Sequence, residues 1–122
     1  MGVPLSPGDG IGTSVAQVQD ALIDHVWVAS ADGVGIQINR GDRVKIVNSK
    51  VSSSDSYGIH FSNGFGDNNV ISNNNISSNG SYGIHMANNS GTISGNTISS
   101  NSDSGIFIGN GSVGEGTSIT GN

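Results

Sequence analysis

Cysteine is absent from the sequence, and only four of its 122 residues are lysine or arginine. Without cysteine, neither a disulfide nor a thiolate metal site can stabilise the fold, so the chain should fold alike in oxidising and reducing surroundings. The formal net charge of -5 argues against nucleic acid and anionic lipid as partners, because both require clustered cations to displace counterions. We therefore expect no nucleic-acid partner.

Long apolar runs are missing as well. No stretch of the sequence approaches the roughly 20 consecutive apolar residues that a membrane span requires. Residues 1–5 also lack the basic and apolar regions of a secretion signal. We therefore expect no membrane partner and no signal peptide in this chain.

Leucine is scarce, with two residues against 14 isoleucines and 11 valines. β-Branched side chains fit pleated strands better than helices. Glycine, serine and asparagine, which favour turns, supply 20, 21 and 15 residues. A chain of this length has room for one modest core. The composition therefore predicts an all-β fold of short strands joined by many turns.

The dipeptide Gly-Ile recurs with a period of about two dozen residues. It begins at Gly35, Gly58, Gly83 and Gly105, at intervals of 23, 25 and 22 residues. Two further apolar registers share this period. They comprise Ile23, Ile46, Ile71, Ile93 and Ile119, and then Val28, Val51, Ile76 and Ile98.

The second and third registers lie five residues apart, as at Ile71 and Ile76. Because strand side chains alternate between two faces, two residues five apart cannot both point inward along one straight strand. The chain must therefore bend between them. Asparagines at 73–75 fill this gap, and asparagine tolerates the left-handed backbone angles of a tight bend. A second polar corner follows the third register at residues 52–54, 77–79 and 99–101.

Each period thus predicts one triangular coil of three short strands, and about 4–5 such coils would stack by parallel pairing. Stacking buries the apolar columns, which a single coil cannot do alone. The corner asparagines are expected to hydrogen-bond to the coils above and below, and Asn122 falls in the column of Asn74 and Asn96.

Residues 1–22 are predicted to form an N-terminal cap or a partial first coil, followed by the repeats of residues 23–122. A short amphipathic helix over residues 13–22 would place Val18 and Leu22 on one face. However, Gly10-Ile11 lies 25 residues before Gly35, which instead predicts one more coil. Both alternatives remain open at this stage.

The C-terminal end of the sequence carries no recognisable cap. An uncapped solenoid exposes apolar columns and open backbone groups, which form a template for association. We therefore expect either a piece of a longer chain, or self-association through the solenoid ends or as a trimer.

The repeats resemble those of a known superfamily. Gly-Ile-His-Phe at 58–61, Gly-Ile-His-Met at 83–86 and Ile-Ser-Asn-Asn-Asn-Ile-Ser-Ser-Asn at 71–79 are similar to repeats of the pectate-lyase-like superfamily. The resemblance covers residues 20–122 and implies a right-handed parallel β-helix. Members include pectate and alginate lyases, polygalacturonases, mannuronan epimerases and phage tailspike shafts, so the fold alone does not choose a function.

One coil carries every basic residue, namely Arg40, Arg43, Lys45 and Lys50. Calcium-dependent lyases of the superfamily use clustered carboxylates to hold calcium and a basic residue to take a proton. The resemblance therefore makes Arg40 or Arg43 the candidate base. The candidate carboxylates to hold calcium are Asp24, Asp32 and Asp42, with Asp20 also within one coil. A solvated charged coil is the alternative interpretation, and the sequence predicts no metal site and no cofactor except calcium under the lyase alternative.

The variable position of the Gly-Ile strands is occupied by Gln37, His60, His85 and Phe107. Alternation places these four side chains in one line on the outer face. Stacked histidines could bind a metal, contact a sugar or meet a neighbouring subunit, while surface decoration is the plainer interpretation. Tyr57 and Tyr82 have the parity of the inward isoleucines and are predicted to stack inside.

Taken together, these patterns favour a non-catalytic β-solenoid shaft or scaffold. The expected setting is a phage tail fibre, a spike, a capsid-surface protein or an extracellular carbohydrate-associated protein, with polysaccharide or further copies as partners. The expected location is extracellular or virion-associated. The alternative is a fragment or minimal form of a polysaccharide lyase or epimerase acting on uronate polymers.

Overall fold

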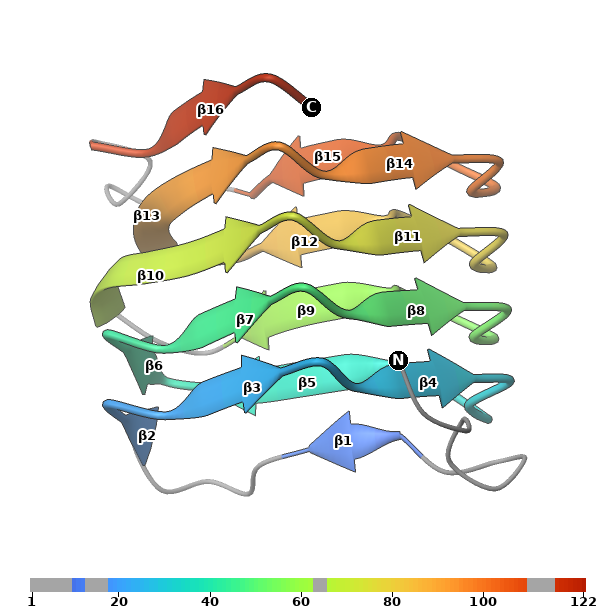
Figure 1. Cartoon of the computed structure of the whole chain (residues 1–122), viewed down its shortest axis with the longest axis horizontal. Helices are drawn as coiled ribbons and strands as arrows, with labels where there is room; N and C mark the ends of the chain where they lie inside the picture. Colours follow the sequence, from blue (N-terminus) through green and yellow to red (C-terminus); the bar gives the residue numbers. More distant parts are fainter. Residues whose placement is uncertain (1–9, 13–17, 63–65, 110–115) are drawn as a thin grey trace.

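The computed structural model describes residues 10–12, 18–62, 66–109 and 116–122, which form an all-β parallel solenoid of about four turns (Figure 1). Sheet 1 contains β1 (Ile11–Gly12), β5 (Ile36–Asn39), β9 (Ile59–Ser62), β12 (Ile84–Met86) and β15 (Ile106–Ile108). Sheet 2 contains β3 (Leu22–Asp24), β7 (Lys45–Val47), β10 (Gly66–Ser72), β13 (Asn89–Ser94) and β16 (Ser118–Thr120). Sheet 3 contains β4 (Trp27–Ala29), β8 (Lys50–Ser52), β11 (Asn75–Ser77) and β14 (Thr97–Ser99).

The three predicted apolar registers are confirmed as three columns of paired residues. In sheet 1, Ile59 lies opposite Ile36 on one side and Ile84 on the other. The same pairing joins Ile46 to Ile71 in sheet 2 and Val51 to Ile76 in sheet 3. These side chains are fully buried, so stacking of the coils creates the core that a single coil lacks.

The predicted asparagine corner between sheets 2 and 3 is confirmed. Asn74 donates through Nδ2 to the Ile46 carbonyl at 2.9 Å and to Asn96 Oδ1 at 3.0 Å. Its own Oδ1 accepts the Ser49 amide proton at 2.9 Å. Asn96 makes the same kind of contact with Asn122, at 2.8 Å. Each amide therefore satisfies backbone groups of the coil below while bonding to the coil above.

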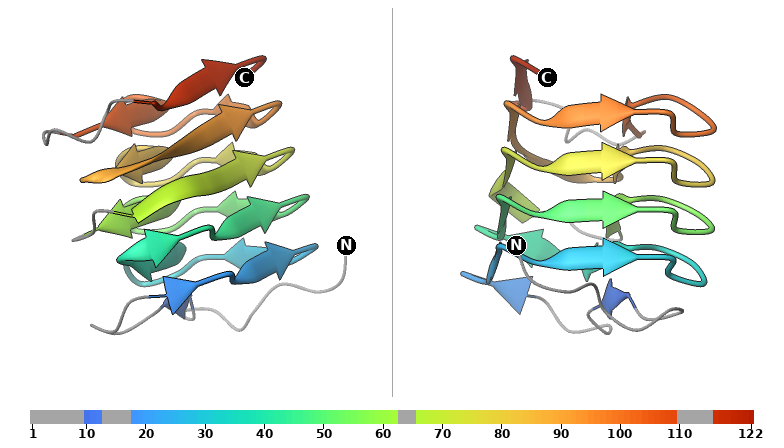
Figure 2. Two further views of the ribbon diagram at one scale, coloured as in Figure 1. Left: turned by 90° about the vertical axis from the view of Figure 1, so that its left-hand side faces the viewer. Right: turned by 45° about the vertical axis from the view of Figure 1, so that its right-hand side comes forward.

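A second ladder follows sheet 3, where the turns after β4, β8, β11 and β14 lie one above another (Figure 2). Asn79 accepts the Ser54 amide proton at 3.0 Å and donates to Asn101 Oδ1 at 2.9 Å. Left-handed backbone angles occur at both corners, with φ of 56° at Asn73 and 58° at Ser78. The second bend lies in the polar corner predicted at residues 52–54, 77–79 and 99–101, and serine occupies its left-handed position although serine adopts this conformation less readily than asparagine or glycine.

The corner between sheets 1 and 2 is more elaborate than a simple triangle. It adds a two-stranded sheet of β2 (Val18–Gln19) and β6 (Gly41–Asp42), and β10 shows a register irregularity against β13. Asn69, which is buried, accepts the Val44 amide proton at 3.0 Å and donates to the Gly41 carbonyl at 2.9 Å. The sequence patterns did not indicate this third amide.

At the N-terminal end, the described residues agree with the alternative of one more coil. Ile11 pairs with Ile36, and Val18 pairs with Gly41. The amphipathic helix proposed over residues 13–22 is wrong for residues 18–22, because Val18–Gln19 form β2 and Leu22 begins β3; residues 13–17 lie outside the described part. Among the described residues there is no helix at all, and hence none that could cross a bilayer.

The glycine of the Gly-Ile repeat stands where a side chain would collide with the core. A Cβ on Gly58 would lie 2.8 Å from Ile76 Cγ2 and 2.8 Å from Asn79 Nδ2. Because Gly58 faces inward and Ile59 is also inward, alternation does not continue through this dipeptide. The prediction that Tyr57 and Tyr82 lie inside is therefore wrong, and both rings are half-buried against outward histidines.

Candidate functional site

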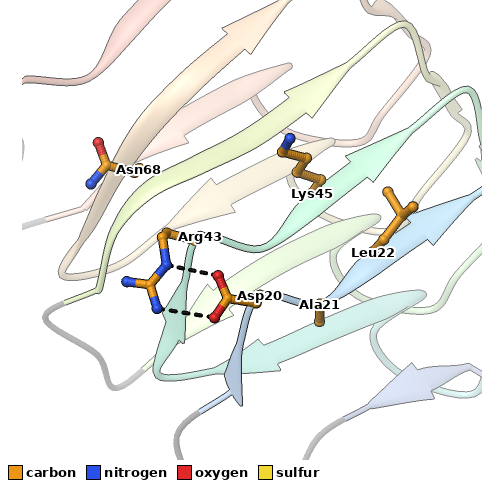
Figure 3. Close-up of a pocket in the computed structure, with 6 residues that line it drawn as sticks. All are labelled: Asp20, Ala21, Leu22, Arg43, Lys45 and Asn68. Atoms are coloured by element: carbon orange, nitrogen blue, oxygen red, sulfur yellow. Dashed lines mark hydrogen bonds and ion pairs between the residues drawn. The ribbon is translucent and has the colours of Figure 1, made fainter.

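The charged coil brings one candidate base and two carboxylates together. Arg43 Nε donates to Asp20 Oδ1 at 2.7 Å, and its Nη2 donates to Asp20 Oδ2 at 3.1 Å (Figure 3). The third donor, Nη1, bonds to Asp42 Oδ2. Such a two-pronged contact matches the fork of a guanidinium to a carboxylate.

These contacts act on the protonation of the groups involved. The hydrogen bond from Arg43 lowers the pKa of Asp20. In return, the hydrogen bond and charge of Asp20 raise the pKa of Arg43 above its already high ordinary value. Arg43 therefore remains protonated at any physiological pH, which is the opposite of what a general base requires.

An open hollow of about 400 Å³ lies beside this pair. Asp20, Ala21, Leu22, Arg43, Lys45 and Asn68 line it (Figure 3). Leu22 is 63% exposed and lies opposite Lys45 on the neighbouring strand. Lys45 and Asn68 form no hydrogen bond or ion pair with the other side chains drawn in Figure 3.

Within the described residues, Asp24, Asp32 and Arg40 share no hydrogen bond or ion pair with Arg43. Asp24, at the end of β3, accepts from Asn48 Nδ2 at 2.9 Å and lies 2.6 Å from His25 Nδ1. The Asn48 hydrogen bond, assisted by the charge of His25, lowers the pKa of Asp24. Asp32 lies in the turn from β4 to β5, on the opposite side of the coil from β6 (Figure 1). Arg40 lies in the bend between β5 and β6, with φ of 55°.

The last basic residue belongs to a different face. Lys50 lies in sheet 3, with its Nζ 4.8 Å from the centre of the Trp27 ring. Lys50 thus lies on a different sheet from Lys45, whereas Arg43 and Lys45 line the same hollow.

The four residues of the outer line stand in register on sheet 1. Gln37 pairs with His60, His60 with His85, and His85 with Phe107. The imidazoles of His60 and His85 are stacked with ring centroids 4.7 Å apart and planes 3° from parallel. No hydrogen bond to either imidazole occurs within the described residues, and His85 Nδ1 is buried without a partner.

A second stack of rings runs beside the histidines. Tyr57 stacks on Tyr82 at 5.7 Å, and Tyr82 stacks on Phe107 at 4.7 Å. Phe107 is tilted by 57° from the His85 ring although the two residues are paired in register. We call these rings the aromatic cluster, which comprises Tyr57, His60, Tyr82, His85 and Phe107.

The surroundings of the aromatic cluster keep both imidazoles neutral. Burial, with a smaller contribution from the charge of His85, lowers the pKa of His60 to about 4. Burial also lowers the pKa of His85. A neutral imidazole carries one donor nitrogen and one acceptor nitrogen, so at neutral pH each ring of the pair retains a nitrogen lone pair.

Comparison with known proteins agrees with the geometry of the solenoid. A family model described as a right-handed β-helix region matches residues 7–122. The chain belongs to the right-handed β-helix family. No curated protein and no solved structure matches it at a significant level.

In this right-handed β-helix, the sequence predicted the outer line and a stack of Tyr57 on Tyr82, but it placed the tyrosines inside. It did not predict that Phe107 would join this stack or that the stack would lie against the histidines. An inward glycine shifts the alternation by one, so the preceding residue points outward and joins its neighbours. Within the described part of the chain, no three His, Cys, Asp or Glu residues lie close enough together to hold a metal ion.

Proposed function

We propose that this right-handed β-helix is a non-catalytic shaft or scaffold module. The proposal rests on the hydrogen bonds of Arg43, which donates to both Asp20 and Asp42. A lyase needs a basic residue free to accept a proton and carboxylates free to bind calcium. Here the same three groups are hydrogen-bonded to one another.

The corners supply the stiffness that a shaft requires. Buried polar groups are costly unless paired, and the amides of Asn74 and Asn79 pair with the coils on both sides. Bending the solenoid would break several such bonds together. The proposal extends to a place in a phage tail fibre, a spike, a capsid-surface protein or an extracellular carbohydrate-associated protein, with polysaccharide or further copies of the chain as partners.

The decisive experiment is a lyase assay. Pectate and alginate are each incubated with the purified chain and calcium, and ultraviolet absorbance is followed for unsaturated uronate products. We expect no change, with an active lyase on the same substrates as the positive control. Product that forms with the wild-type chain and disappears with Arg43→Gln or Arg40→Gln would establish the enzyme alternative instead.

Calcium titration gives an independent check. A ligand that binds only the folded form stabilises it by about 2.7 kcal/mol at 100 times its Kd. We expect the thermal midpoint in calcium to equal that in magnesium at the same ionic strength. A rise specific to calcium that is lost in Asp42→Asn would contradict the scaffold proposal.

Association between copies is tested separately by sedimentation velocity over a wide range of concentration. Self-association through solenoid ends or as a trimer predicts a sedimentation coefficient that rises with concentration. A coefficient that stays at the monomer value throughout would remove further copies of the chain from the proposed partners.

A further inference from the structure

We propose that Asn79-Gly80 is a site of spontaneous deamidation that the folded solenoid protects, so that the reaction marks chains that have unfolded and prevents them from refolding. The site lies in the turn that follows β11, within the second asparagine ladder. The inference concerns a covalent modification of this turn and does not depend on the scaffold proposal.

The reaction joins two neighbouring residues of the chain. The Gly80 amide nitrogen attacks the side-chain carbonyl carbon of Asn79 and loses its proton, ammonia leaves, and a cyclic succinimide is formed. Water then opens the ring at either of its carbonyl groups, which gives aspartate or isoaspartate. Glycine at the second position favours the attack, because it has no Cβ and has the widest backbone freedom of any residue.

The geometry of the corner requires both residues of this pair. Asn79 is fully buried, accepts the Ser54 amide proton at 3.0 Å and donates to Asn101 Oδ1 at 2.9 Å. A Cβ on Gly80 would lie 2.2 Å from the Asp55 carbonyl oxygen, which leaves no room for a side chain. The fold therefore places a glycine directly after a buried amide, although this is the pair that cyclises most readily once the backbone is free.

Three other ladder asparagines are followed by a residue with a side chain, which hinders the approach of the backbone nitrogen. These pairs are Asn74-Asn75, Asn96-Thr97 and Asn101-Ser102. Among these four ladder asparagines, Asn79 is therefore the one at which deamidation is expected first.

The folded chain holds the reacting groups in place. Gly80 donates its amide proton to the Ser54 carbonyl at 2.8 Å, and the Asn79 carboxamide is bonded to the coils on both sides. Rotation of the carboxamide toward the Gly80 nitrogen would break several of these hydrogen bonds together. Burial also excludes the water that must take up the proton and open the ring. Cyclisation therefore requires the corner to open, and its rate should follow the fraction of open molecules.

Neither product fits the ladder. Aspartate lacks the Nδ2 donor, so it would place a negative charge against the acceptor Asn101 Oδ1 in a fully buried position, which is costly. Isoaspartate adds a methylene group to the main chain and would shift this turn relative to the turns below and above it (Figure 2). A chain that reacts while unfolded is therefore unable to rebuild this corner.

The first test compares the full chain folded in buffer with the same chain unfolded in guanidinium chloride, both at the same mildly alkaline pH. A chymotryptic peptide of residues 66–82 contains Asn79-Gly80 and excludes the Asn-Gly pairs at 63–64 and 110–111. Mass spectrometry of its fragments locates the conversion of amide to acid. We expect conversion at Asn79 in the unfolded chain and a rate at least about a hundredfold lower in the folded chain. Similar rates in the two states would overturn the proposal.

A variant separates the reaction from the stability of the fold. Gly80→Ala is compared with the wild type in guanidinium chloride alone, where neither chain is folded. The added side chain should slow conversion at Asn79 by roughly tenfold. An unchanged rate would show that the Gly80 nitrogen is not the attacking group.

The effect on refolding is tested with the products themselves. A partly converted sample is refolded, and the folded fraction is separated by size-exclusion chromatography; it should be depleted of chains converted at Asn79. Asn79→Asp supplies one product directly and should lower the urea midpoint or prevent folding. Its matched control is Asn75→Asp, which adds the same charge at an exposed position of β11 and should fold as the wild type does. An equal share of converted Asn79 in the folded and unfolded fractions, or a wild-type midpoint for Asn79→Asp, would contradict the proposal.

Discussion

The asparagine corners and the aromatic cluster are both stacks of like side chains on successive coils, yet they differ in what their polar atoms meet. Asn74 is buried and uses its donors and its acceptor on Ser49, Ile46 and Asn96. His85 stands on the same kind of ladder, but its contacts are with ring faces and edges, and its Nδ1 has no partner.

The difference follows from the shape of the two groups. An amide carries a donor and an acceptor at its tip, so the next amide of the stack and the nearby backbone complete its hydrogen bonds. A neutral imidazole stacked on another covers its ring face while leaving its nitrogens at the edge. Repetition therefore stabilises the fold at the corners, and on the outer line it leaves His85 Nδ1 without a hydrogen-bond partner.

The largest expected effect comes from breaking a corner. Asn74→Ala removes the partners of the buried Ser49 amide and the Ile46 carbonyl, and an unsatisfied buried group costs about 1–3 kcal/mol. We expect the free energy of unfolding to fall by about 3 kcal/mol, measured by urea denaturation.

The control for this change is the neighbouring residue Asn75, which is exposed on β11. Asn75→Ala should change the free energy of unfolding by less than about 0.5 kcal/mol. Equal losses at the two positions would show that the ladder hydrogen bonds do not stabilise the corner.

The next largest loss of stability is expected from adding a side chain at the glycine of the Gly-Ile repeat. A Cβ on Gly83 would lie 2.8 Å from Ile98 Cγ2 and 2.8 Å from Asn101 Nδ2. Overpacking of this kind costs about 1–3 kcal/mol, so Gly83→Ala should lower the urea midpoint clearly. Gly33→Ala is the matched control, since a Cβ there would meet nothing within 4 Å; a similar loss for both variants would assign the effect to the backbone and not to crowding.

The interior was predictable from the sequence because its rule is simple and repeated. Residues one coil apart occupy equivalent places, so the columns through Ile46, Ile59 and Val51 follow once the period is known. The corner amides follow in the same way, since asparagine recurs where two inward residues stand five apart. Each repeat confirms the next, which makes the pattern robust to single substitutions.

The candidate site was less predictable, because it depends on how far the chain travels around one coil. Asp20 lies 23 residues before Arg43 and binds it, whereas Asp24 lies 24 residues before Asn48 and binds that residue instead. The side-chain direction of residues near the corners also could not be read from strand alternation, as Tyr57 shows. Both outcomes depend on bends in the backbone, where side chains do not alternate between two faces.

Acidification should affect the aromatic cluster and not the asparagine corners, because of these two sets of side chains only the imidazoles titrate between pH 7 and 5. His60 has a pKa of about 4 in the folded chain against about 6.5 when unfolded. The unfolded chain therefore takes up a proton that the folded chain refuses, and stability is lost as the pH falls below 6.5. Solvent screening at this half-buried site reduces the effect, which we expect to be about 1 kcal/mol between pH 7 and 5.

This pH dependence is measured by urea denaturation of the chain. His60→Gln should reduce the loss of stability between pH 7 and 5, and the remaining loss should come from His85, whose pKa burial also lowers. A wild-type profile that is flat over this range would show that the stacked imidazoles are protonated as readily as free ones.

The smallest effect is expected at the most conspicuous ion pair. Asp20 and Arg43 are joined by two hydrogen bonds, but both side chains are largely exposed, at 68% and 48%. Exposed pairs gain little, because water competes for the charges and two flexible side chains must be ordered. Asp20→Asn should therefore leave the thermal midpoint unchanged within error, at both low and high salt. A marked, salt-sensitive fall would mean that Arg43 anchors β2 and β6 to one another, and that the charged coil belongs with the corners as part of the framework.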